Sequence, residues 1–350
     1  MAYTTIDNPE LYFQTKLYTG NGSNSHAITF DGDENMQPDW VWIKDRGSNS
    51  HRLTDSVRGA TKVIYSDLNF AEATDADTIQ SFDSNGFTLD DDADTNGNGQ
   101  NFASWNWKAG TSFSNDASAT GVGSIDSTGS INTTAGFSII SYTGNGSGGA
   151  TVGHGLGVTP NWIIVKNREA TENWRQFHHS LGNTFNINLS TTNAKEDSAD
   201  MWNDTSPTSS VFTIGTNNGV NKSGDGLIAY CFAEKKGYSK FGSYTGNGNA
   251  DGPFIYTGFR PAWVLQKNAD ASQGWQLQDN KRDGFNGANK LLQPHTSQAE
   301  SDVNRIDILS NGFKVITTDA GQNSSGTTYI FMAFAESPFV NSNGVPCNAR

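Results

Sequence analysis

The sequence predicts an all-β protein made of three tandem antiparallel β-sandwich modules of lectin-like or jelly-roll type. Three observations carry this prediction: a recurring pentapeptide, short apolar runs rich in aromatic and β-branched residues, and dense turn residues between them. Glycine alone accounts for 38 of the 350 residues, and convincing helical periodicity is nearly absent. Many short strands at even spacing are typical of sandwiches and jelly rolls.

The pentapeptide Tyr-Thr-Gly-Asn-Gly marks the beginning of each module. It occupies residues 18–22, 142–146 and 244–248, at offsets of 124 and 102 residues. An identity repeated in this way indicates tandem duplication of a unit of about 100 residues, which is the common size of a domain. The simplest interpretation of the pentapeptide itself is a strand end that runs into a glycine-dependent turn.

Further landmarks follow each pentapeptide in the same order. A Pro-x-Trp begins a short run that is rich in aromatic and β-branched residues and ends on a lysine, which predicts a strand at Trp40–Lys44, Trp162–Lys166 and Trp263–Lys267. Each module then closes on a second apolar run, at 102–107, 227–232 and 329–334.

One segment between these landmarks is different in composition. Residues 111–134 are rich in Ser, Thr, Gly and Ala, and we interpret them as a linker or strap that lets module 1 move or packs on a neighbouring chain. Modules 2 and 3 have no such spacer and should be rigidly coupled. The predicted boundaries are an N-terminal arm at 1–14, module 1 at 15–110, the strap at 111–134, module 2 at 135–236, module 3 at 237–340 and a C-terminal tail at 341–350.

Charge and hydropathy narrow the range of partners and compartments. The net charge is −13, and residues 1–110 carry 17 acids against 7 bases, so a nucleic-acid partner is not expected. No stretch approaches the ~18 apolar residues that span a bilayer, so membrane insertion is not expected either. The first residues, Met1–Asp7, lack the pattern of a signal peptide, and we expect synthesis in a bacterial cytoplasm.

An acidic loop in module 1 is the one candidate for a metal site. Asp92, Asp94 and Asn96, followed by Gly97, match the first half of a calcium-binding loop, but Ala103 stands where the closing glutamate would be. The other modules lack the carboxylate cluster. The alternative interpretation is an acidic hairpin loop, and we expect no cofactor otherwise.

Two tryptophans are candidates for a ligand or interface role. Trp174 and Trp275 both stand eight residues past the module lysine, where module 1 has Arg52. Tryptophan on a β surface can stack on a sugar ring, whereas repeated aromatic positions commonly belong to a core.

The sequence contains no recognisable catalytic set, and we expect a protein that is not an enzyme. Glu234 and Glu336 could suggest the paired carboxylates of a glycosidase, but they lie in different modules, and module 1 has Ala109 at the matching place. The adjacent His178 and His179 would point to opposite faces of a strand and cannot jointly hold a metal ion.

The sequence as a whole resembles a family of tandem-repeat bacteriophage virion proteins that is abundant in marine phages. The resemblance is carried by the pentapeptide, by 37–44 and 55–62 of module 1, by 237–248 and 329–336 of module 3, and by the opening Met1–Asp7. These relatives are described as concanavalin A-like lectin or tail-fibre-like proteins. The resemblance therefore implies a virion component with a lectin-like sandwich fold.

The resulting expectation is a non-catalytic phage structural protein, an exterior appendage of tail-fibre or receptor-binding type. Its partners would be other virion proteins, with residues 1–14 as an anchor to the particle and a host surface glycan as a possible ligand. A homo-oligomer, a trimer by analogy with fibres, is expected. The alternatives are a capsid decoration or tail-hub accessory protein, a polysaccharide depolymerase, and a carbohydrate-binding module without a virion role.

Overall fold

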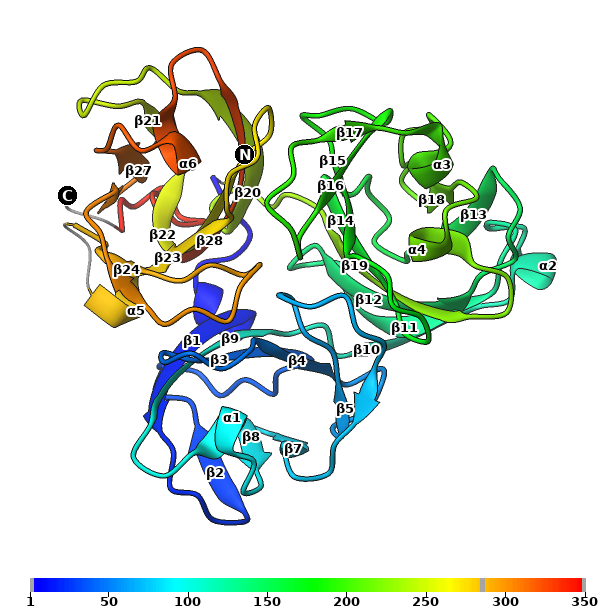
Figure 1. The fold of residues 1–350 in the computed structure, drawn as a ribbon, viewed down its shortest axis with the longest axis horizontal. Helices are drawn as coiled ribbons and strands as arrows, with labels where there is room; N and C mark the ends of the chain where they lie inside the picture. The colour runs from blue at the N-terminus through cyan, green and yellow to red at the C-terminus, as the bar shows by residue number, and fades with distance from the viewer. Residues whose placement is uncertain (1–2, 284–286, 348–350) are drawn as a thin grey trace.

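Three lobes of β-structure surround a common centre in the computed structural model, which describes residues 3–283 and 287–347 (Figure 1). The predicted all-β class is confirmed, because the lobes consist of antiparallel sheets and the described helices are single turns. None of the helices in residues 3–283 and 287–347 has the length and apolar character needed to cross a membrane.

Module 1 contains the strands that the landmarks predict. Its elements are η1 (Pro9–Leu11), β1 (Phe13–Thr19), β2 (His26–Thr29), β3 (Trp40–Asp45), β4 (Arg52–Asp55), β5 (Lys62–Val63), β6 (Ala73–Thr74), β7 (Ile79–Asp83), β8 (Gly86–Leu89), α1 (Ala93–Asn96) and β9 (Asn101–Trp107).

Module 2 repeats this order. Its elements are β12 (Phe137–Thr143), β13 (Ala150–Gly153), β14 (Trp162–Asn167), β15 (Arg175–His178), β16 (Phe185–Asn188), β17 (Glu196–Asp197), α3 (Ala199–Trp202), β18 (Val211–Ile214), α4 (Asn218–Asn221) and β19 (Gly226–Phe232).

Module 3 does so again. Its elements are β20 (Ser239–Thr245), β21 (Phe254–Tyr256), β22 (Phe259–Asn268), β23 (Gln276–Asp279), α5 (Asn280–Asp283), β24 (Lys290–Leu291), β25 (Ser301–Asp302), β26 (Ile306–Leu309), β27 (Gly312–Val315), α6 (Ala320–Asn323) and β28 (Thr328–Pro338).

The large sheets of the three modules share one strand order. The pentapeptide strand pairs with the closing strand, which pairs with the Pro-x-Trp strand, which pairs with the next strand along the chain. The three orders are β1-β9-β3-β4, β12-β19-β14-β15 and β20-β28-β22-β23. Smaller sheets, β2-β8-β7, β13-β18 and β21-β27-β26, cover the outer face of each.

Each large sheet is buried on both faces. On β3, Val41 and Ile43 point to an outer core inside module 1, whereas Trp40 and Trp42 point to a core shared by all three modules. Because side chains alternate along a strand, one apolar run can fill both cores. The shared core is dense in aromatic rings, and Trp40 packs against Tyr230 of module 2 with ring centroids 4.4 Å apart.

Contacts between aromatic rings join the remaining pairs of modules as well. Trp107 of module 1 meets Trp263 of module 3 at 5.6 Å, and Phe232 of module 2 meets Phe334 of module 3 at 5.9 Å. Large aromatic groups dominate the energetics of such buried contacts. The three modules are therefore one packed body, and module 1 is not free to move as the sequence suggested.

Residues 111–134 are a structured extension of module 2 rather than a linker. They form β10 (Thr111–Asn115), α2 (Ala117–Thr120) and β11 (Ser127–Asn132), and β11 pairs with β12. The strands β10 and β11 add to one edge of the second large sheet, and β16 and β17 add to the other, so that this sheet has eight strands. The small polar residues of β10 and β11 hid this from the sequence, since an edge strand needs few large apolar groups.

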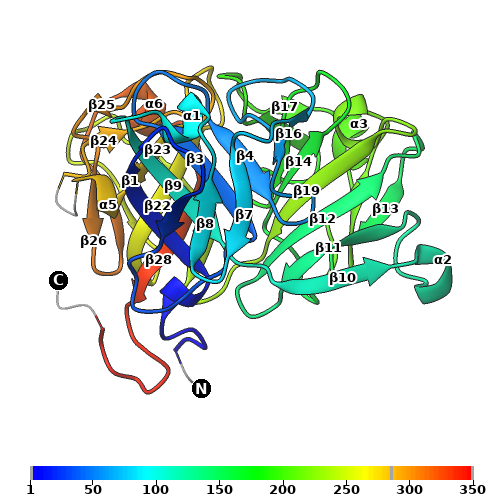
Figure 2. The same ribbon diagram turned by 90° about the horizontal axis from the view of Figure 1, so that it is seen from below.

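The predicted N-terminal arm folds back onto module 3. Ile6 is buried in the shared core, and the Tyr3 hydroxyl donates to the Gly258 carbonyl at 2.9 Å. Asp7 accepts a hydrogen bond from the backbone N–H of Ser342, at 2.6 Å, so the arm also holds the C-terminal segment. Both ends of the chain lie at the same end of the molecule (Figure 2). Residues 1–2 and 348–350 lie outside the described residues.

Candidate functional site

The interfaces between modules contain a closed ring of equivalent hydrogen bonds. Trp174 Nε1 of module 2 donates to the Tyr65 carbonyl of module 1 at 2.7 Å, and Trp275 Nε1 of module 3 donates to the Asn188 carbonyl of module 2 at 2.9 Å. Both tryptophans are fully buried. The structure thus places these two predicted residues inside interfaces between modules, with no ring face open to a ligand.

His51 completes this ring. Its Nδ1 accepts from Trp42 Nε1 at 2.9 Å, so the ring proton lies on Nε2, which donates to the Gln293 carbonyl of module 3 at 3.2 Å. Burial lowers the pKa of His51 well below its ordinary value and keeps it neutral. Module 1 therefore bonds to module 3, module 2 to module 1, and module 3 to module 2, which is the closed arrangement of a cyclic trimer.

The spacing in the sequence aligned Arg52 with Trp174 and Trp275, but in the structure the equivalent residue of module 1 is His51. Trp40 pairs with Asp55, whereas Trp162 pairs with His178 in the next module, so the turn of module 1 is one residue shorter. The counterpart of Arg52 is therefore Arg175, beside Trp174. Arg52 itself forms an ion pair with Asp94 within module 1.

A second set of contacts between modules involves buried carboxylates. The Tyr230 hydroxyl of module 2 donates to Asp55 Oδ2 of module 1 at 2.6 Å, and Trp105 Nε1 of module 1 donates to Asp279 Oδ2 of module 3 at 3.0 Å. The interface between modules 2 and 3 has no equivalent bond to a carboxylate, because module 2 has His178 where modules 1 and 3 have an aspartate.

Arginines neutralise both aspartates. Arg58 contacts Asp55, and Arg282 contacts Asp279, each within a fully buried ion pair. Such a pair costs much to break, since removing one partner leaves an uncompensated buried charge.

Ion pairs also cross each interface at the rim. Glu72 of module 1 binds Arg168 of module 2, and Glu300 of module 3 binds Arg46 of module 1. The interface between modules 2 and 3 has the opposite arrangement of charges. There Lys195 of module 2 forms an ion pair with Asp270 of module 3. The interface between modules 2 and 3 therefore differs in charge from the other two, while the geometry is repeated in all three.

The pentapeptide and the acidic loop are two halves of one structural contact. In module 2 the Tyr142 hydroxyl donates to the Val220 carbonyl at 2.7 Å, and Asn221 Oδ1 accepts from the Asn145 N–H at 2.9 Å. A Cβ on Gly144 would lie 2.3 Å from the Lys222 carbonyl, and Gly146 has a φ of +73°. Modules 1 and 3 repeat these contacts, so the pentapeptide docks the single-turn helix of its own module.

The groups proposed for calcium serve this contact in module 1. Asp92 caps α1 by accepting from the Asp94 N–H at 2.9 Å, and Asn96 Oδ1 accepts from the Asn21 N–H at 2.9 Å. Asp94 pairs with Arg52. No cluster of three potential metal ligands occurs within residues 3–283 and 287–347. Calcium binding at this loop stays a prediction, to be tested by calorimetric titration.

The two candidate glutamates form separate ion pairs. Glu234 pairs with Lys240, and Glu336 pairs with Arg260, each within or beside its own module. The structure therefore does not bring Glu234 and Glu336 together.

His179 lies at an interface, with Nε2 2.9 Å from the Phe241 carbonyl of module 3. The rings of His178 and His179 do lie close, with centroids 5.0 Å apart, so the expectation that they point to opposite faces of a strand is wrong. The reason is that β15 ends at His178, which leaves His179 outside the strand.

The module lysines are buried beside the same rim. In module 1, Lys44 Nζ donates to the Gly47 carbonyl at 2.7 Å, and in module 2, Lys166 Nζ donates to the Glu172 carbonyl at 2.9 Å. Burial lowers the pKa of Lys44 and of Lys166 to about 8, and that of Lys267 to about 7. The spacing of these lysines was visible in the sequence, but their burial was not.

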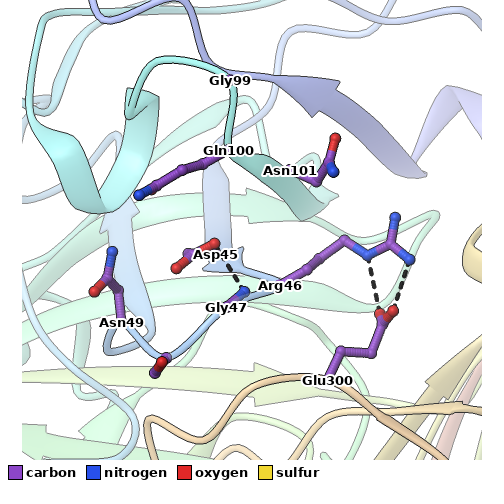
Figure 3. Close-up of a pocket in the computed structure, with 9 residues that line it drawn as sticks. Asp45, Arg46, Gly47, Asn49, Gly99, Gln100, Asn101 and Glu300 are labelled. Atoms are coloured by element: carbon purple, nitrogen blue, oxygen red, sulfur yellow. Dashed lines mark hydrogen bonds and ion pairs between the residues drawn. The ribbon is translucent and has the colours of Figure 1, made fainter.

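An open cleft of about 530 Å³ lies on this rim, where module 1 meets module 3 (Figure 3). Its lining is polar and comes from the turn after β3, the start of β9 and the loop before β25: Asp45, Arg46, Gly47, Ser48, Asn49, Gly99, Gln100, Asn101 and Glu300. Arg46 forms a two-point ion pair with Glu300, through Nε at 3.0 Å and a terminal nitrogen at 2.6 Å. Sequence reasoning missed this cleft, because its walls belong to different modules.

Comparison with known proteins gives a family but no function. A family model described as a domain of unknown function (DUF7483) matches residues 8–338. No curated protein and no solved structure matches the chain.

Proposed function

The chain belongs to the DUF7483 family, and we propose that it is a non-catalytic structural protein of a bacteriophage particle, an exterior appendage of tail-fibre or receptor-binding type. The sequence resemblance to phage virion proteins suggests that the particle is a bacteriophage. The arrangement of the three modules supports a structural role.

The observation that carries the proposal is the closed ring of three modules around one core. Trimeric fibres place three identical domains about one axis, and this chain places three related domains about a shared core by tandem duplication. The ring closes through the equivalent bonds of His51, Trp174 and Trp275. We propose that a single chain thereby provides the threefold platform that three separate chains provide in a fibre.

The two ends of this platform differ, which favours an appendage with one attached and one free end. The termini lie at one end, while α1, α3 and α6 lie at the other (Figure 2). The cleft beside Arg46 lies at the end opposite the termini, because Arg46 follows β3 and Asn101 begins β9, whereas Trp107 at the far end of β9 pairs with Phe13. We propose that the end with the termini faces other virion proteins and that the opposite end faces outward.

Localisation on intact particles tests this proposal. Gold-labelled antibodies against the purified chain should decorate the tail or its fibres in electron micrographs, and a particle reconstruction should show three-lobed density there. Labelling absent from purified particles would overturn the virion role.

A capsid decoration protein is the second candidate, and the same threefold arrangement favours it. An icosahedral shell offers local threefold positions on its surface, which a three-module chain could occupy with one copy. Label distributed over the capsid lattice would establish this candidate and exclude the fibre.

A further inference from the structure

The cleft between modules 1 and 3 contains a position at which module 1 lacks a side chain that the other two modules possess. After the Pro-x-Trp strand, each module makes the same turn. Asp45 accepts from the Gly47 N–H at 2.8 Å, Asn167 from the Glu169 N–H at 2.9 Å, and Asn268 from the Asp270 N–H at 3.0 Å. Gly47, Glu169 and Asp270 are therefore equivalent positions.

In modules 2 and 3 the carboxylate at this position has a defined role. Glu169 accepts a hydrogen bond from the backbone N–H of Gly226 at 2.9 Å, and Asp270 accepts one from the backbone N–H of Thr328 at 2.8 Å. Gly226 and Thr328 are the first residues of the two closing strands, β19 and β28. The carboxylate thus accepts from the N–H of the first residue of the closing strand.

The corresponding N–H in module 1 belongs to Asn101. The Asn101 carbonyl accepts from the Arg46 N–H at 2.9 Å, as those of Gly226 and Thr328 accept from Arg168 and Ala269. The N–H and C=O of an extended residue point to the same side, so the Asn101 N–H faces the turn at Gly47. The described part of the chain offers it no acceptor, and it faces the open cleft.

The glycine at position 47 is not required by its own backbone. Gly47 is not among the glycines with positive φ, so its conformation is one that other residues adopt. What distinguishes it is the space that its missing side chain leaves in the cleft. The Asn101 N–H and the open cleft therefore meet at the place where modules 2 and 3 hold a carboxylate.

We propose that this cleft binds a carboxylate-bearing sugar residue, whose carboxylate occupies the place of the Glu169 and Asp270 side chains and accepts from the Asn101 N–H. Arg46 supplies a positive charge, and in Figure 3 its nitrogen that does not contact Glu300 points away from that carboxylate. Charge-assisted bonds from a guanidinium suit a carboxylate.

The remaining lining suits the hydroxyl groups of a sugar. Ser48, Asn49 and Gln100 offer hydroxyl and amide groups that can both donate and accept. Two groups oppose an anion: Asp45, whose carboxylate is buried beneath the turn, and Glu300, whose ion pair offsets part of the positive charge of Arg46. Both reduce the affinity. The choice of a sugar rather than an acidic peptide rests on the proposed function, in which the outward end meets a host surface.

A pair of variants isolates this interaction. The double substitution Asp45→Asn with Gly47→Asp copies the Asn268-x-Asp270 turn of module 3 and fills the cleft with an internal carboxylate. Asp45→Asn is included because a new carboxylate at position 47 would otherwise lie beside the buried Asp45 carboxylate, whose Oδ2 would be 2.8 Å from the added Cβ. Asp45→Asn alone is the matched control, since it keeps the cleft open and removes one opposing charge.

Isothermal titration calorimetry on the full chain provides the test, with an oligoglucuronate, its carboxyl-reduced neutral form and an oligoglutamate peptide as probes. We expect the oligoglucuronate to bind the native chain, to bind Asp45→Asn more tightly, and to lose at least tenfold in affinity with the double variant. Thermal unfolding of each variant establishes that it is folded.

Three results would overturn the inference: no binding of the oligoglucuronate, equal binding of the neutral form, or undiminished binding by the folded double variant. Binding of the oligoglutamate alone would replace the sugar with an acidic peptide and refute the inference as stated. None of these results bears on particle localisation, so the virion role fails or stands by its own experiment.

Discussion

At the scale of single residues, the structure places charged and polar groups where the chain is completely buried. Asp55 and Asp279 are held between an arginine of their own module and an aromatic donor of the next. The module lysines are held by backbone carbonyls at the ends of their strands. Such groups add little net stability when satisfied, but they cost much when a partner is lost, so they favour one arrangement of the modules.

Removing the hydroxyl of Tyr230 should destabilise the protein. Tyr230→Phe removes the donor to Asp55 at 2.6 Å, and a hydrogen bond to a charged group contributes about 1.5–3 kcal/mol. Urea unfolding should show a loss of that size. Tyr256→Phe is the control, because Tyr256 is exposed and its loss should stay within about 0.5 kcal/mol. Equal stability of the two variants would contradict the role of this bond.

The buried lysines should make stability increase with pH in the mildly alkaline range. Burial lowers the pKa of Lys267 to about 7, whereas an unfolded lysine keeps a pKa of about 10.4. Between these two pH values the unfolded chain binds more protons than the folded chain, so stability rises as the pH increases from 7 toward 10.

Replacement of Lys267 should therefore flatten this rise. Urea unfolding midpoints of Lys267→Met at pH 7, 8 and 9 should differ less from one another than those of the native chain. Lys236→Met serves as the control, since this side chain is exposed. A slope in the Lys267 variant equal to that of the native chain would refute the assignment.

At the scale of elements, the pentapeptide is a dock for a single-turn helix. The buried asparagine at the end of that helix, Asn221 in module 2, receives the backbone N–H of Asn145 and donates to the carbonyls of Ser147 and Gly215. One side chain thus ties the pentapeptide turn, the helix and the strand before it. This explains why the five residues are identical in the three modules while the neighbouring loops differ.

Truncating this asparagine should be costly. Asn221→Ala leaves several buried backbone groups without partners, and we expect a loss of about 2–4 kcal/mol in the free energy of unfolding. The matched control is Asn193→Ala, at an exposed loop position. If chemical denaturation shows the same stability for both variants, the docking role is wrong.

At the scale of the whole molecule, the shared aromatic core makes the three modules interdependent. Trp40 and Trp162 begin β3 and β14, and Trp263 lies within β22; all three side chains lie in that core. A chain of separate domains would unfold in steps, whereas a common core makes partial unfolding expensive, because it exposes large aromatic surfaces of the modules that remain.

Unfolding should therefore occur in one transition despite the length of the chain. Tryptophan fluorescence and far-ultraviolet circular dichroism should give coincident urea curves. Module 2 expressed alone, as residues 135–236, should aggregate or stay unfolded, since Trp162 and Trp174 would face water. Separate transitions, or a stable monomeric module 2, would contradict the single-core description.

Much of the fold could be predicted from the sequence, since it depends on local patterns. The pentapeptide, the Pro-x-Trp strands and the closing runs are encoded in short segments, and their spacing is repeated in the chain. The all-β class follows from them. The sequence did not decide whether Trp174 and Trp275 bind a ligand or belong to a core, because the same aromatic run can face solvent, a ligand or another sheet.

The interfaces and the cleft were decided by tertiary structure alone. The apolar strands at 162–167 and 227–232 have no alternating polar face, a sign that both faces are covered, but the sequence does not say what covers them. The cleft at Gly47 depends on Glu300, which is more than two hundred residues away along the chain. The amino-acid sequence by itself determined the number and order of the modules, since their landmarks are short local patterns that recur along the chain. Only the packing of one module on another decided which tryptophans are buried and where a donor is left open, since those contacts join distant parts of the chain.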